Sequence, residues 1–354
     1  MTNSNVMISR LAVCIALLAA PAAVFAQDAS ETQAANGTSR SAVAAGFTLA
    51  SVSVAEEGTS ETAAQQSKPE GQPPGQQSQG AGGPGAPGAP GAPPFQMPKI
   101  VFDETWASVG IGAGLVPSYT GSDDYIVFPL PLIVGRVGGV GISPNGPGFV
   151  LDLNSAKPSF APPKSRVSFG PAFRIRNDRV AQIEDRVVEQ LPDLDLAIEL
   201  GGNIGYSFPS VFKSRDALTI STQVRWDVAG AHEGMLIEPS IGYRLPVNRG
   251  TALQIQTGLQ FVDDSFADYY FSVTPGQSAT TGLPVFNADG GLNSIGTTAI
   301  LNVDLNGNLL DGGFNVYAIG GYTRLVGDAA DTPFTDIRGN ANQFIGGIGI
   351  GYTF

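Results

Sequence analysis

The chain has 354 residues and a formal net charge of −12, with one histidine and one cysteine. This composition excludes a disulfide framework and the zinc or iron–sulfur sites that need several His or Cys ligands. The excess of acidic residues argues against a nucleic-acid partner, because surfaces that bind nucleic acids are basic.

The first 26 residues have the pattern of a secretory signal peptide. Arg10 precedes an apolar run over 11–20, and Val24 and Ala26 occupy the −3 and −1 positions of a cleavage site. The run is shorter than the roughly 20 apolar residues that a membrane-spanning helix needs. We therefore expect residues 1–26 to be removed on secretion, and with them Cys14, the only cysteine.

Residues 27–98 consist mainly of Ala, Gln, Ser, Gly and Pro, and they end in Gly-Ala-Pro triplets. Such a segment buries too little apolar surface to offset the entropy of ordering it. We expect a disordered linker here, with a tail that threads peptidoglycan or binds a partner as the alternative. The folded domain is expected over 99–354.

From about residue 100 onward, apolar and polar residues alternate. In 218–228, for example, Ile220 and Trp226 lie on one face of the expected strand, and Gln223 and Arg225 on the other. The runs exceed the roughly 5–6 residues of an ordinary strand and match the roughly 9–11 residues that cross an outer membrane. Charged residues in mid-strand fit a wet lumen.

An open sheet edge is not viable in lipid, so we predict an all-β fold, an antiparallel transmembrane β-barrel of about twelve strands. The expected strands are 105–116, 125–135, 139–153, 165–176, 194–208, 217–229, 234–246, 251–262, 266–274, 292–304, 313–325 and 342–353. An even count places both ends of the barrel in the periplasm. Outward connections are then 117–124, 154–164, 209–216, 275–291 and 326–341. This count places two further connections in the periplasm. One is 177–193, whose apolar residues have the near-helical spacing of a short amphipathic helix, and the other is the turn that holds His232.

Two groups of candidate residues follow from this barrel. The last strand has an apolar face that ends in Ile350, Tyr352 and Phe354, which resembles the signal that outer-membrane assembly machinery reads. We expect that machinery, outer-membrane lipid and lipopolysaccharide as partners. Charged and amide residues in mid-strand are expected to point into the lumen, namely Arg166, Arg174, Arg176, Glu199, Gln223, Arg225, Asp227 and Asp304. They line an ion path or form a salt-bridged network that fills the barrel, and both interpretations stay open.

Five segments resemble the MipA/OmpV family of Gram-negative outer-membrane proteins. They are 119–131, 199–206, 232–234, 268–278 and 324–333, and together they span the expected barrel. The loop residues that carry the resemblance are Tyr119, Gly121, Ser122, Asp123, Asp124, Arg324, Gly327, Asp328, Asp331 and Pro333. The segment 27–98 is not something we associate with the family.

The resemblance implies a non-enzymatic outer-membrane barrel that acts as a scaffold for a lytic transglycosylase and a peptidoglycan synthase on its periplasmic face. Other members are linked to permeability, adhesion or antigenicity, so a small-solute channel and a surface-exposed adhesin or antigen are the alternatives. The family is not known for a reaction, and we expect neither an enzyme nor a cofactor. The acidic pairs Asp123/Asp124 and Asp328/Asp331 are interpreted as solvated surface rather than as metal ligands.

Overall fold

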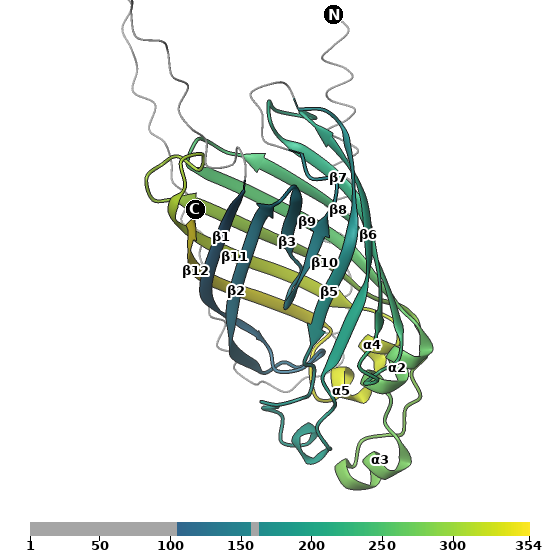
Figure 1. The fold of residues 1–354 in the computed structure, drawn as a ribbon. Coiled ribbons are helices and arrows are strands. Elements are labelled where there is room, and N and C mark those ends of the chain that lie inside the picture. Colours follow the sequence, from purple (N-terminus) through teal and green to yellow (C-terminus); the bar gives the residue numbers. More distant parts are fainter. Residues whose placement is uncertain (1–104, 157–162) are drawn as a thin grey trace, which may run out of the picture. The chain divides into compact units, whose positions relative to one another are not determined.

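The structure, a computed structural model, describes residues 105–156 and 163–354. The expected signal peptide and the linker over 27–98 lie outside the described residues. Twelve antiparallel strands close a barrel in which each strand pairs with its neighbours in sequence and β1 pairs with β12 (Figure 1). The strands are β1 (Trp106–Pro117), β2 (Tyr125–Val137), β3 (Val140–Pro144), β4 (Gly148–Asp152), β5 (Arg166–Arg176), β6 (Ala197–Pro209), β7 (Ala217–Asp227), β8 (Met235–Pro246), β9 (Thr251–Val262), β10 (Gly291–Asp304), β11 (Gly313–Leu325) and β12 (Asn342–Thr353).

The barrel confirms the predicted fold class, and its outer surface is the apolar face of the alternating pattern. Ile111, Val127 and Ile348 are 72%, 67% and 62% exposed, as lipid-facing residues should be. Among the described residues, no helix is long and apolar enough to cross a membrane.

Two expected strands are wrong, although the total agrees. The run 139–153 is a hairpin of two short strands, β3 and β4, whose turn over 145–147 contains Gly146 at a φ of +59°. The run 266–274 is mostly helix α2 (Asp264–Phe271), which begins where the Asp263 carboxylate accepts the N–H of Phe266. Its buried residues, Phe266, Ala267, Tyr270 and Phe271, follow helical spacing.

Between these two errors every strand runs in the direction opposite to the expected one, so the connections there lie at the other end of the barrel. The end of the barrel where β1 begins and β12 ends, here called the terminal end, carries 138–139, 153–165, 210–216, 247–250 and 305–312. The opposite, capped end carries 118–124, 177–196, 228–234, 263–290 and 326–341. The expected outward connections 154–164 and 209–216 are therefore at the terminal end, whereas 177–193 and the His232 turn are at the capped end.

Four connections of the capped end, 118–124, 177–196, 263–290 and 326–341, pack into what we call the cap. It contains η3 (Val188–Gln190), α2, α3 (Pro275–Thr281), α4 (Asp328–Asp331) and α5 (Pro333–Asp336), and Figure 1 shows these helices at the end opposite the C-terminus. The amphipathic helix expected in 177–193 is reduced to the single turn η3.

Two apolar clusters hold the cap in the mouth of the barrel. In the first, Phe266 and Phe271 of α2 pack with Leu236 and Leu325 of the wall. In the second, Tyr119, Val188 and Phe334 come from three different connections. The Thr332 hydroxyl, which is fully buried, donates to the Phe271 carbonyl at 2.6 Å. The cap is thus a packed continuation of the barrel core.

The seam where β12 meets β1 is bridged from inside the barrel by Tyr317 of β11. In register, Tyr317 lies opposite Gly349, Gly349 opposite Gly112, and Gly112 opposite Leu130 of β2. The Tyr317 hydroxyl crosses both glycines and donates to the Leu130 carbonyl at 2.7 Å. The ring needs that space, since a Cβ on Gly349 would come within 2.3 Å of the Tyr317 Cζ.

We predict that Gly349→Ala lowers the stability of the folded barrel by about 1–3 kcal/mol, because the added methyl group displaces Tyr317 from the seam. The measurement is the midpoint of heat-induced unfolding, followed by the shift in electrophoretic mobility that separates folded from unfolded barrels. Gly346→Ala on the same strand is the matched control, because nothing lies within 4 Å of the position of its added Cβ. Equal midpoints for the two variants would contradict the assignment.

Candidate functional site

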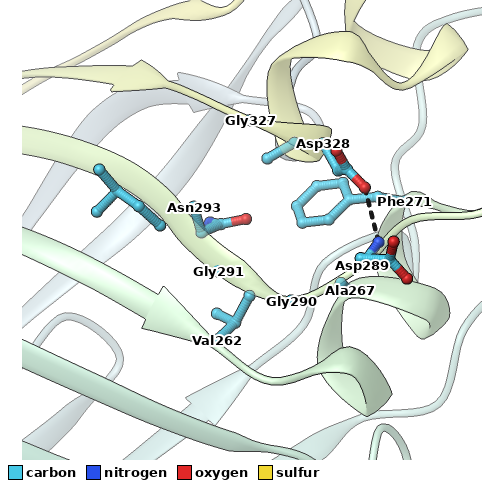
Figure 2. Close-up of a pocket in the computed structure, with 11 residues that line it drawn as sticks. Val262, Ala267, Phe271, Asp289, Gly290, Gly291, Asn293, Gly327 and Asp328 are labelled. Atoms are coloured by element: carbon cyan, nitrogen blue, oxygen red, sulfur yellow. Dashed lines mark hydrogen bonds between the residues drawn. The ribbon is translucent and has the colours of Figure 1, made fainter.

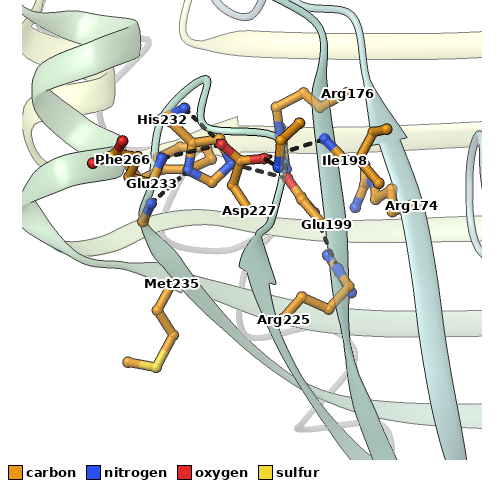
Figure 3. Close-up of polar contacts among 12 residues, drawn as sticks. Arg174, Arg176, Ile198, Glu199, Arg225, Asp227, His232, Glu233, Met235 and Phe266 are labelled. Carbon is orange, nitrogen blue, oxygen red and sulfur yellow. Dashed lines mark hydrogen bonds and ion pairs between the residues drawn. The ribbon is translucent and has the colours of Figure 1, made fainter.

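Below the cap, five charged side chains and His232 form a buried group that we call the charged cluster. Figure 3 shows Glu199 of β6 between two arginines: Arg176 Nε lies 2.7 Å from Oε1, and Arg225 Nε lies 3.0 Å from Oε2. Arg225 also reaches Glu238 of β8 at 2.6 Å, and Arg174 lies 3.4 Å from the same carboxylate. The cluster therefore links β5, β6, β7 and β8 across the inside of the barrel.

His232 connects the charged cluster to the cap. Its ring packs edge-on against Phe266 of α2, with the ring centroids 4.9 Å apart. The Gly234 N–H donates to Nδ1 at 3.0 Å, so the ring proton resides on Nε2, which faces Glu199 at 3.6 Å. The Arg176 guanidinium lies over the Phe266 ring at 4.9 Å. The lone histidine is therefore a packing residue at the junction of wall and cap.

The structure brings together only part of the expected lumen set. Gln223 joins the charged cluster by accepting from Arg225 Nη1 at 2.7 Å. Asp227 instead accepts backbone N–H groups of the His232 turn. Arg166 lies at the terminal end and pairs with Asp152 at 2.5 Å, and Asp304 accepts N–H groups within the turn after β10.

Sequence reasoning missed Glu238 and Gln260, which complete the charged cluster. The Gln260 amide donates to Glu238 Oε1 at 2.7 Å and accepts from Asn293, which is itself buried. Glu238 has the required parity on β8, but Pro239 follows it and obscures the alternation there. The interstrand register, which the sequence does not specify, is what brings Glu238 to Arg225.

The loop residues that carry the family resemblance meet in the cap. Tyr119 donates to the Phe334 carbonyl at 3.3 Å, and Ser122 forms a bridge with Gly339. The Gly121 N–H donates to Gln343, and Asp328 accepts the N–H of Asp289 at 2.7 Å. Gly327 precedes α4 at a φ of +56°, and Pro333 begins α5. Arg324 ends β11 near its pairing with Asn342, while Asp123 and Asp124 are exposed.

The connection 177–196 is fastened to the cap by Asp185. Its carboxylate accepts the N–H groups of Val187 and Val188, both at 2.9 Å, and receives Arg338 Nη2 at 2.5 Å. Burial by itself raises the pKa of Asp185, but these hydrogen bonds outweigh burial and hold the pKa below its ordinary value. The ionised form is therefore the one that the cap binds.

One small cavity, of about 110 Å³, lies where the cap meets β9 and β10. Figure 2 shows its lining, which includes Phe271 of α2, Asn293 of β10, and Asp289 and Asp328 from two connections. It is large enough for only a few waters. Among the described residues, no group of three or more His, Cys, Asp or Glu side chains is arranged to hold a metal ion.

The arrangement as a whole is a network of buried ion pairs beneath the cap. Arg174, Arg176 and Arg225 each face a carboxylate, and no hydroxyl nucleophile lies within hydrogen-bonding distance of the His232 ring among the described side chains. The charged cluster lies inside the barrel, directly below the packed cap.

We predict that Arg225→Met destabilises the folded barrel by about 3–5 kcal/mol, because it leaves two buried carboxylates short of a partner. The heat-induced mobility shift measures this change. Arg186→Met, at an exposed cap position, is the control and should leave the midpoint unchanged. Adding Glu199→Gln to Arg225→Met should recover part of the loss, and full additivity would argue against a coupled cluster.

We further predict that Asp185→Asn loosens the cap by about 1–3 kcal/mol, through loss of a charged acceptor for Arg338 and two buried N–H groups. The readout is faster proteinase K cleavage within 177–196 of the purified, folded protein at neutral pH. Glu184→Gln, an exposed neighbour, is the control.

The pH dependence has a definite sign because the pKa of Asp185 is lowered in the folded state. Its contribution is complete above the ordinary aspartate pKa and is lost as the pH falls through the lowered value. Acidification should therefore lower the protection factors of the amides in 177–196, which correct for the pH dependence of intrinsic exchange, more in the wild type than in Asp185→Asn. An equal acid response in both proteins would contradict this role.

Comparison with known proteins adds a family to this geometry. The model of the family described as "MltA-interacting protein MipA" matches residues 109–354. No curated protein matches the chain.

Two solved structures from Pseudomonas aeruginosa are similar at 10% identity. The outer membrane protein OprD gives a TM-score of 0.28 over 69% of this chain and 65% of its own, so the match spans less than two thirds of OprD. A FadL homologue gives a TM-score of 0.22 over 71% of this chain and 89% of its own.

Proposed function

The chain belongs to the MipA family and is an outer-membrane β-barrel protein, and on this premise we propose that it is a non-conducting scaffold for peptidoglycan-remodelling enzymes. The terminal end faces the periplasm in this proposal, because outer-membrane barrels carry short turns on the periplasmic side and long connections outside. The family description names an interaction with MltA, and the partner class proposed here is a lytic transglycosylase, together with a peptidoglycan synthase.

The observation that carries the proposal is the opposite charge of the two ends. Among the described residues, the turns of the terminal end hold four exposed basic residues, Lys164, Lys213, Arg215 and Arg249, against one exposed acidic residue, Asp311. The connections of the capped end hold sixteen acidic residues against three basic ones. In a chain with a net charge of −12, a basic periplasmic face is a surface suited to an acidic partner.

Apart from the exposed Asp311, two carboxylates near the terminal end are engaged in hydrogen bonds and ion pairs of the barrel, which leaves the exposed basic residues in excess. Asp216 accepts three backbone N–H groups and the Tyr243 hydroxyl, the last at 2.7 Å. Burial raises the pKa of this carboxyl, but the Tyr243 and backbone hydrogen bonds outweigh burial and lower it. Asp152 pairs with Arg166. Three turns thus present four basic side chains to the periplasm.

The alternative of a small-solute channel is disfavoured by the cap and the charged cluster, which obstruct the lumen from the outside. A surface-exposed adhesin or antigen would use the exposed residues of the cap, and nothing in the packing selects for it. We also propose that Ile350, Tyr352 and Phe354 act as the assembly signal. In support of this, they are exposed on the outer face at the seam, where the Phe354 N–H donates to the Ala107 carbonyl.

The test is cross-linking in intact envelopes, followed by affinity purification through a tag inserted after Gly282, an exposed position of the capped end. We expect recovery of a transglycosylase or a peptidoglycan synthase above a matched control barrel. The variant with Lys164→Gln, Lys213→Gln, Arg215→Gln and Arg249→Gln should lower recovery about tenfold, because the electrostatic complement is lost. Arg186→Gln removes one charge at the other end and should not.

Recovery of assembly factors alone would contradict the scaffold proposal. Steady conductance of the wild-type protein in planar bilayers at neutral pH would support the channel instead. These two measurements are independent, so each alternative has its own positive result.

A further inference from the structure

We propose that the barrel wall has a lateral opening between β2 and β3, through which the acyl chain of a lipid-phase molecule reaches the lumen. Strand β2 pairs with β1 over its whole length. Strand β3 pairs with β2 only at Gly135, Arg136 and Val137. Within the described part of the chain, 125–134 of β2 therefore have a strand partner on one side only. This inference does not depend on the scaffold role.

The opening arises because the β3–β4 hairpin follows β5 and leaves β2. Gly148 of β4 lies opposite Arg174 of β5, and the Ile175 N–H donates to the Pro147 carbonyl at 2.9 Å. At the hairpin tip, Asn145 Nδ2 donates to Gln223 of β7 at 3.0 Å. Since Gln223 belongs to the charged cluster, the tip leans toward the lumen and away from the edge of β2.

The sequence of both strands suits a place where a sheet separates. Proline is tolerated on strand edges because it has no N–H to leave unpaired. Strand β2 contains Pro129 and Pro131, and Pro144 ends β3 just beyond the last pair with β2. Irregular backbone at membrane depth is viable only where it is buried in protein or lines a cavity. The free edge of β2 therefore borders the lumen.

The lining beside this edge is apolar on both faces of β2. Val127 and Ile133 face lipid, at 67% and 52% exposure, while the alternating Ile126, Phe128 and Leu130 face inward and are only partly buried. Ile345 of β12 also faces inward, since it alternates with the outward Phe344, yet it is 39% exposed. The lumen is thus unfilled on this side.

Continuity with the lipid-facing surface identifies the occupant. An apolar lining that meets the hydrocarbon through a gap accommodates an acyl chain without uncovering a charged group. The arginines and glutamates of the charged cluster lie on β5 to β8, away from this lining. The chemistry is that of an acyl chain, and its source is either a free fatty acid or a phospholipid.

The experiment is photolabelling of the full mature chain in phosphatidylcholine vesicles, in two arms. One uses a fatty acid with a diazirine near its methyl end, and the other a phosphatidylcholine with the same group in one chain. Peptide mapping by mass spectrometry then locates the label. We expect label on inward-facing Phe128 and Leu130, and the arm that gives it identifies the source.

A cross-linked variant closes the gap. The Val134→Cys, Ser143→Cys pair extends the β2–β3 register by one step beyond Gly135 and Ile142, and the only native cysteine is Cys14. Oxidation should lower the inward label about tenfold, because the disulfide holds the β3–β4 hairpin against the edge of β2 and narrows the passage, and reduction should restore it. The control is a Ser207→Cys, Thr219→Cys pair between β6 and β7, which are fully paired. Label confined to outward positions in both arms, or unchanged by the β2–β3 cross-link, would overturn the proposal.

Discussion

The need to pair every backbone amide at membrane depth governs this structure. A sheet in lipid has to close, and closure brings β12 against β1 at a seam made largely of glycine. The absence of side chains there gives Tyr317 room to reach across two strands to the Leu130 carbonyl. One side chain thus holds three strand interfaces in register, at the seam where the last strand of the sequence pairs with the first.

Closure also decides where charge can lie. With the outer face given to lipid, every ionised side chain in mid-strand turns inward, where a buried charge is costly without a partner. Glu199 satisfies this by accepting from Arg176 and Arg225 on both sides. The remaining charge goes to the two ends, acidic at the capped end and basic at the terminal end. A partner that approaches from either side therefore meets a different potential.

The alternating pattern was sufficient to predict a closed barrel, its outer face and the membership of most strands. It failed where local signals override period two. In 264–271 the Asp263 cap and the Phe266–Tyr270 spacing favour a helix, although the same residues alternate well enough to resemble a strand. One strand lost and one strand gained left the count intact but moved 154–164, 177–193, 209–216 and the His232 turn to the other end of the barrel. The side of the membrane that each connection faces therefore cannot be derived from a strand count alone, and our proposed orientation uses the lengths of the connections instead. The charged cluster depended on register, and register is set by packing between strands that are distant in sequence.

The division of the lumen explains why the wall can open at β2. Across β5 to β8, Arg176 and Arg225 both bind Glu199, and Arg225 also binds Glu238, so these ion pairs favour strands that stay paired. On β2 no inward residue from Ile126 to Val134 is polar. Two positions of its outer face, Pro129 and Pro131, are prolines. Separation there breaks no ion pair and exposes no charge to hydrocarbon. The cap meets the wall through Arg176, His232 and α2, and it makes no comparable demand on the apolar side. In the lateral opening that we propose, an acyl chain therefore enters beside β2 without disturbing the ion pairs of the charged cluster.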